Sequence, residues 1–136
     1  MRGTFLVKFD ERRGFIPVNP ILLDDSYYLK NQDLLKEIAK NAIGFGSLEF
    51  NSFELQGINC ISKKFTIPKE SARGGGETFS LVIVSDKDVM RFKTGLNTTI
   101  EKLMQNWSNV EKYMQNLYKA VKYPEQPILF KDEQKK

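Results

Sequence analysis

The stretch 78–86, Thr-Phe-Ser-Leu-Val-Ile-Val-Ser-Asp, constrains the fold more than any other part of the chain. It is rich in β-branched residues and follows a glycine-rich turn at residues 74–76. In a strand its apolar side chains alternate between the two faces of a sheet, with Phe79, Leu81 and Ile83 on one face and Val82 and Val84 on the other. A strand that is apolar on both faces is typical of the interior of a sheet covered on both sides. This stretch therefore predicts a sheet with helices above and below it.

The N-terminal part of the chain predicts a β-hairpin. Residues 4–9 and 15–19 have the composition of strands and flank the polar turn Asp10–Gly14. Pro17 and Pro20 lack the N–H that a neighbouring strand would need, so we expect the second strand to lie at a sheet edge.

Two more strands, 48–55 and 57–67, are expected to meet near Gln56-Gly57. In the second of them, apolar residues occupy both odd and even positions. Either a bulge near Cys60 or burial on both faces would explain this pattern. The loop 69–77 is then expected to lead into the stretch 78–86.

Three helices are predicted from apolar residues that recur every three or four positions. The first covers residues 32–43, with Asn31 as its N-cap. The second follows Asp86 or Asp88 and ends near Trp107, which we expect to anchor in the core. The segment 108–111, Ser-Asn-Val-Glu, has the spacing of a capping box and predicts the start of the third.

The order of elements is thus β-β-α-β-β-β-α-α. It predicts an α/β domain of the α+β type, in which a five-stranded antiparallel sheet carries one helix on one face and two on the other. We expect this domain to cover residues 1–123, and residues 124–136 to form a flexible C-terminal tail.

The residue types that are scarce in the chain restrict its chemistry. The 136 residues include no histidine and a single cysteine, so His-dependent nucleophiles, His-ligated metals and intrachain disulfides are excluded. Cys60 is expected to be a small buried apolar residue. The close carboxylates Asp24-Asp25 and Asp86/Asp88 need no role beyond turns and helix caps. We therefore expect no enzyme activity, no cofactor and no metal.

Charge and hydropathy indicate where the protein acts. The net charge of +4 arises from 21 basic and 17 acidic residues, with no concentrated basic stripe along the sequence, so no nucleic-acid partner is expected. The N-terminus has no signal peptide, and every apolar run is far shorter than a membrane span of about 20 residues. These features predict a cytoplasmic protein.

The order of elements resembles the longin domain and, more broadly, the longin/roadblock group of small dimerising scaffolds. The resemblance extends over about residues 4–122 and rests on four parts, which are the hairpin 5–18, the helix 34–43, the meander 53–84 and the helical end. The turn Phe9–Phe15 is also similar to the opening of archaeal longin-like proteins.

The resemblance implies a non-enzymatic scaffold that binds or regulates a small GTPase, for example in vesicle trafficking. It implies pairing as a homodimer or heterodimer with another longin/roadblock-like subunit, with the first helix as the preferred surface. Membranes would be contacted peripherally if at all. Profilin-like proteins share much of this arrangement, so a profilin-like actin-binding module is the alternative.

The candidate partner-binding residues are charged side chains in turns and apolar side chains outside regular elements: Arg12, Arg13, Tyr27, Tyr28, Lys69, Arg73, Ile128, Leu129 and Phe130. The alternatives are that the charges are simply solvated and that the apolar residues fold back onto the domain. The loop 69–77 is rich in glycine but opens a strand, whereas a phosphate-binding loop opens a helix, so a flexible loop or a partner contact is the better interpretation.

Overall fold

The computed structural model describes residues 1–24, 32–43, 50–68 and 76–124. Their elements are, in chain order, β1 (Gly3–Asp10), β2 (Gly14–Leu23), α2 (Gln32–Ile43), β3 (Asn51–Leu55), β4 (Ile58–Pro68), β5 (Gly76–Ser85), the 3₁₀ turn η2 (Met90–Phe92), α3 (Lys93–Gln105), the 3₁₀ turn η3 (Trp107–Asn109) and α4 (Val110–Lys122). The strands form one sheet in the order β2-β1-β5-β4-β3, and every neighbouring pair is antiparallel. The predicted element order and the five-stranded antiparallel sheet are thus confirmed.

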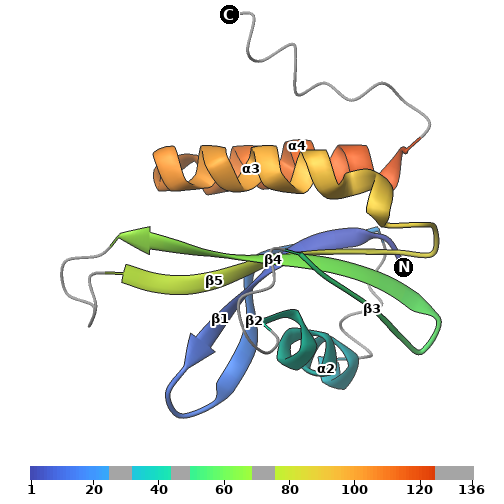
Figure 1. Ribbon diagram of the computed structural model, residues 1–136, viewed down its shortest axis with the longest axis horizontal. Coiled ribbons are helices and arrows are strands. Elements are labelled where there is room, and N and C mark those ends of the chain that lie inside the picture. Colours follow the sequence, from blue (N-terminus) through green and yellow to red (C-terminus); the bar gives the residue numbers. More distant parts are fainter. Residues whose placement is uncertain (25–31, 44–49, 69–75, 125–136) are drawn as a thin grey trace, which may run out of the picture.

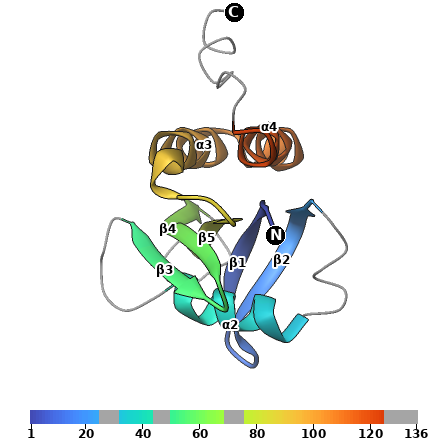
Figure 2. The same cartoon turned by 90° about the vertical axis from the view of Figure 1, so that its right-hand side faces the viewer.

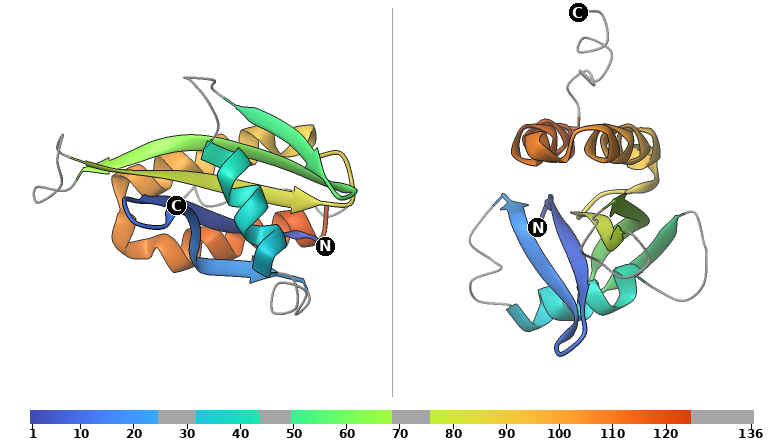
Figure 3. Two further views of the ribbon diagram at one scale, coloured as in Figure 1. Left: turned by 90° about the horizontal axis from the view of Figure 1, so that it is seen from below. Right: turned by 90° about the vertical axis from the view of Figure 1, so that its left-hand side faces the viewer.

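The sheet lies between two helical layers (Figures 1 and 2). α2 lies across the strands on one side, as the view from below shows (Figure 3). α3 and α4 run side by side on the other. Each layer has its own apolar core, because buried residues of α2 cluster with one face of the sheet and those of α3 and α4 with the opposite face.

β5 is the central strand, paired with β1 on one side and β4 on the other. Its odd-numbered residues Phe79, Leu81 and Ile83 belong to the core beneath α3 and α4. Val82 and Val84 belong to the core around α2. The predicted division of this strand between two buried faces is confirmed, and it follows from the period of two in a strand.

In β4, apolar residues occupy both odd and even positions because the strand is buried on both faces, and not because of a bulge. The pairing of β4 with β5 runs without a shift from Asn59 to Pro68. Ile58 and Cys60 therefore face α2, while Ile61 and Phe65 face α3 and α4.

The two edges of the sheet differ. β2 forms one edge, as its prolines predict. Its pairing with β1 is interrupted between Phe5 and Leu6, where Asn19 and Pro20, joined by a cis peptide bond, have no partner residue. β3 forms the other edge and pairs with β4 in an unbroken register.

The start of α4 differs from the prediction. Asn109, not Ser108, is the N-cap, and no side chain caps the helix. Ser108 lies inside the 3₁₀ turn η3, where its hydroxyl donates a hydrogen bond of 2.6 Å to Asn106 Oδ1. The capping box was wrong because the extra turn places Ser108 before the cap. Trp107, in the same turn, packs against Phe79 with ring centroids 4.9 Å apart.

Candidate functional site

The described residues hold no cluster of candidate metal ligands. Among them no three His, Cys, Asp or Glu side chains lie close enough to hold a metal ion. In the same residues no helix is long and apolar enough to cross a membrane. Cys60 is fully buried, and this burial raises the pKa of its thiol to about 12. The thiol therefore stays protonated and unreactive in the folded protein.

The β1–β2 hairpin tip is built around Asp10. Its Oδ1 accepts hydrogen bonds from the backbone N–H groups of Arg12 and Arg13, both 2.9 Å long, and these two bonds hold the pKa of Asp10 below its usual range. Gly14 closes the turn with a φ of 77°, a left-handed conformation that suits glycine. Asp10 Oδ2 also contacts the Arg13 guanidinium at 3.4 Å. Arg13 is thus bound to its own turn, whereas the Arg12 side chain forms no hydrogen bond or ion pair with the described residues.

Two aromatic residues accompany these arginines. Phe9 and Phe15 lie opposite each other in the β1–β2 pairing, and their ring centroids are 5.2 Å apart. Phe9 is 49% exposed, which is unusual for so large an apolar side chain. Sequence reasoning placed Phe9 at the end of the strand 4–9 and did not single it out. The signal for its exposure is its place one pair before Asp10 and Gly14, the pair that closes the turn.

At the β3 edge, two residues have backbone groups that point away from the sheet. Gln56-Gly57 forms a two-residue hairpin loop with φ of 52° and 80°, as in a type I′ turn. The closing pair of such a loop, Leu55 and Ile58, exchanges backbone hydrogen bonds, and bonded and non-bonded pairs alternate along the strands. The N–H and C=O groups of Ser52 and Glu54 therefore point away from β4. None of the described strands pairs with this side of β3.

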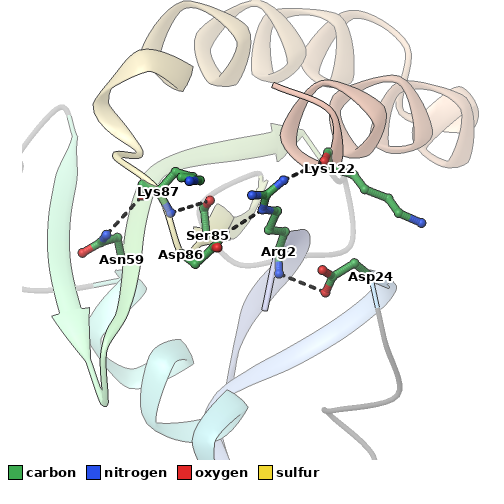
Figure 4. A network of polar contacts seen from close by, with 7 residues as sticks. All are labelled: Arg2, Asp24, Asn59, Ser85, Asp86, Lys87 and Lys122. Atoms are coloured by element: carbon green, nitrogen blue, oxygen red, sulfur yellow. Dashed lines mark hydrogen bonds and ion pairs between the residues drawn. The ribbon is translucent and has the colours of Figure 1, made fainter. Parts of the chain in front are cut away.

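A network around Arg2 joins three distant segments at one corner of the molecule (Figure 4). Its Nε contacts Asp86 Oδ1 at 2.6 Å, and its Nη1 donates a hydrogen bond of 3.0 Å to the Lys122 carbonyl at the end of α4. The backbone of Arg2 exchanges hydrogen bonds with Asp24, whose Oδ1 accepts from the Arg2 N–H at 3.0 Å. The hydrogen bond from Arg2 holds the pKa of Asp86 below its usual range.

This network is structural. A cation at the C-terminal end of a helix is favourable because the last carbonyl groups carry partial negative charge. Arg91 makes a similar contact, donating from Nη2 to the Pro124 carbonyl at 2.7 Å. Asp24 and Asp86, which sequence reasoning assigned to turns and caps, are both engaged with Arg2. Together the contacts of Arg2 hold the start of β1 to the ends of β2, β5 and α4.

Two of the nine predicted partner-binding residues, Arg12 and Arg13, lie in the described part of the structure, and the turn brings them together. The others lie outside the described residues, namely Tyr27, Tyr28, Lys69, Arg73, Ile128, Leu129 and Phe130. The solvent-facing positions of α2, the helix expected to mediate dimerisation, are all polar or charged: Gln32, Asp33, Lys36, Glu37, Lys40 and Asn41.

Comparison with protein-family models finds none that matches this chain. A comparison with curated proteins likewise finds no match. The fold and the surfaces described above define the class of the protein, an α+β domain whose sheet is covered on both faces and whose edge strand β3 has no further strand beside it among the described residues.

Proposed function

We propose that this protein is a non-enzymatic interaction scaffold of the longin/roadblock type that binds or regulates a small GTPase. The observation that carries the proposal is the arrangement of the five strands and three helices of the described residues, in the order that the resemblance implies. Because the protein's own helices cover both faces of the sheet, partners are left with the sheet edges, the hairpin tip and the outer faces of the helices.

The β3 edge is the surface best suited to pairing with a second copy or another longin/roadblock-like subunit. The β2 edge is interrupted by two prolines and an irregular register, which discourage strand addition. β3 contains no proline and offers the outward N–H and C=O groups of Ser52 and Glu54. An added strand would extend the sheet by backbone hydrogen bonds. The polar outer face of α2 next to it argues for pairing through the edge rather than through an apolar helix face.

The variant Ser52→Pro tests this pairing surface. Proline is tolerated in an edge strand where the N–H points to solvent, so the contacts of β3 with β4 should survive. The dimer should weaken by about 10- to 100-fold, because each copy loses an intermolecular hydrogen bond. Analytical ultracentrifugation over a range of protein concentrations measures the change. Ser52→Ala keeps the N–H and should dimerise like the unaltered protein. A protein that is monomeric throughout, or a proline variant that still dimerises, would show that β3 is not the pairing surface.

Binding to purified small GTPases tests the proposed function itself. Each GTPase from the same source is presented in its GDP-bound and GTP-bound states, and binding is measured by calorimetry. We expect one GTPase to bind, with different affinities in its two nucleotide states. An actin polymerisation assay separates the profilin-like alternative, since a GTPase scaffold leaves the time course unchanged. Failure to bind any GTPase would overturn the proposal, whatever the oligomeric state.

A further inference from the structure

One part of the chain carries a net charge equal to that of the whole protein. Residues 90–124 contain six basic residues, Arg91, Lys93, Lys102, Lys112, Lys119 and Lys122, and only two acidic ones, Glu101 and Glu111. In the rest of the sequence, 15 basic and 15 acidic residues cancel. The net charge of +4 therefore belongs to the layer formed by η2, α3, η3 and α4.

These cations lie on the side of the layer that faces away from the sheet or along its rim. The inward positions of α3 and α4 are occupied by buried apolar residues, namely Leu96, Ile100, Leu103, Met114, Leu117 and Val121. All six cations are exposed or half-buried. The two helices lie side by side at one level, on the same side of the sheet (Figure 2). We call the outer side of this layer the basic face.

Aromatic rings hold several of these cations in place. The Lys122 ammonium lies 5.7 Å from the ring centroid of Tyr118 and 5.5 Å from that of Tyr123. Lys102 lies 5.9 Å from the ring of Tyr113. These cation–π contacts orient the two cations. Lys112 and Lys119 are exposed and contact no carboxylate in the described part of the chain.

The same layer exposes apolar side chains. Met90, Met104 and Tyr123 are each exposed by 44% to 46%. With Phe9 at the hairpin tip, they are the large apolar residues most exposed in the described residues. Cations interspersed with partly exposed apolar and aromatic side chains are the composition that binds at a bilayer surface.

We propose that the basic face docks onto the surface of a membrane that contains anionic phospholipids. Charge complementarity supports this partner, since the layer carries the whole net charge of the protein. Two helices that lie at one level suit a planar bilayer better than the grooved surface of a nucleic-acid duplex. Its apolar side chains can enter the headgroup region, where a nucleic-acid backbone has nothing to match them. The inference does not depend on GTPase binding, because it concerns a different surface.

Co-sedimentation with vesicles tests the proposal. The full chain should bind vesicles of phosphatidylcholine and phosphatidylserine at low salt, and bind vesicles of phosphatidylcholine alone far more weakly. Each basic residue near an acidic bilayer is worth about fivefold in affinity. The double variant Lys112→Gln/Lys119→Gln should therefore bind about 25-fold more weakly. Both side chains are exposed, so the fold should be kept, which circular dichroism verifies.

A matched control distinguishes the effect of charge on the basic face from the effect of the protein's net charge. Lys36→Gln/Lys40→Gln removes the same charge from the exposed side of α2, on the opposite side of the sheet. It should weaken vesicle binding by less than about twofold, because beyond about one Debye length these charges are screened. Equal losses in both double variants would overturn the proposal, as would no preference for acidic vesicles. Loss of binding to duplex DNA or RNA by the Lys112/Lys119 variant, with vesicle binding unaffected, would assign the face to nucleic acid instead.

Discussion

Ile83→Ala should lower the free energy of unfolding by about 3 to 4 kcal/mol, as expected when a large aliphatic side chain is removed from a close-packed core. Ile83 is fully buried in the central strand β5 and packs in the core beneath α3 and α4. Its loss leaves a cavity that a sheet fixed by four other strands cannot readily close. Urea unfolding followed by circular dichroism measures the change.

Two further substitutions in β5 make this a test of the two-sided core. Val84→Ala should lower the free energy of unfolding by about 2 kcal/mol, because Val84 is fully buried on the opposite face, against α2. Thr78→Ala, at an exposed position of the same strand, should change the free energy by no more than about 0.5 kcal/mol. If Val84→Ala were as neutral as Thr78→Ala, α2 would not cover this face in solution.

The core was predictable because the sequence pattern that indicates it lies within single strands. Alternation along residues 78–86 predicts which side chains of β5 face each layer, and the structure agrees. The prolines of β2 likewise predict an edge strand. The apolar pattern of β4 left two explanations open, since a bulge and burial on both faces give the same sequence pattern. The continuous pairing with β5 decided between them, and that pairing depends on a strand some twenty residues away.

The surfaces were less predictable, because they bring together residues that are distant in sequence. Arg2 contacts the backbone of Lys122 and the carboxylate of Asp86, and no local pattern marks such a pairing. The cations of residues 90–124 are widely spaced and form no stripe in the sequence. Two antiparallel helices place them in one layer. Among the predicted partner-binding residues, the arginine pair at the hairpin tip looked equivalent in sequence. The contact of Arg13 with Asp10 makes Arg12 the freer of the two.

Cys60 should react with a thiol reagent such as DTNB only when the protein unfolds. The thiol is fully buried on the face of β4 that packs against α2, and burial raises its pKa to about 12. A free cysteine, with a pKa of about 8.5, is about one quarter thiolate at pH 8. With a pKa of about 12 the thiolate fraction falls to about one in ten thousand. Reaction of the native protein should therefore be slower than that of the urea-unfolded chain by a factor of at least about a thousand, even before restricted access is counted.

Combining this measurement with Ile83→Ala asks whether the two cores unfold as one unit. Cys60 and Ile83 face opposite layers, so a local opening of α2 would expose the thiol without disturbing Ile83. If only global unfolding exposes Cys60, the rate of labelling follows the unfolding equilibrium. Lowering the free energy of unfolding by about 3 to 4 kcal/mol then raises the labelling rate by about two to three orders of magnitude. We expect this acceleration, because β5 contributes side chains to both cores. Thr78→Ala should label at the rate of the unaltered protein. If Cys60 in the Ile83→Ala variant were also labelled at the rate of the unaltered protein, the α2 layer would open independently of the helical layer on the other face.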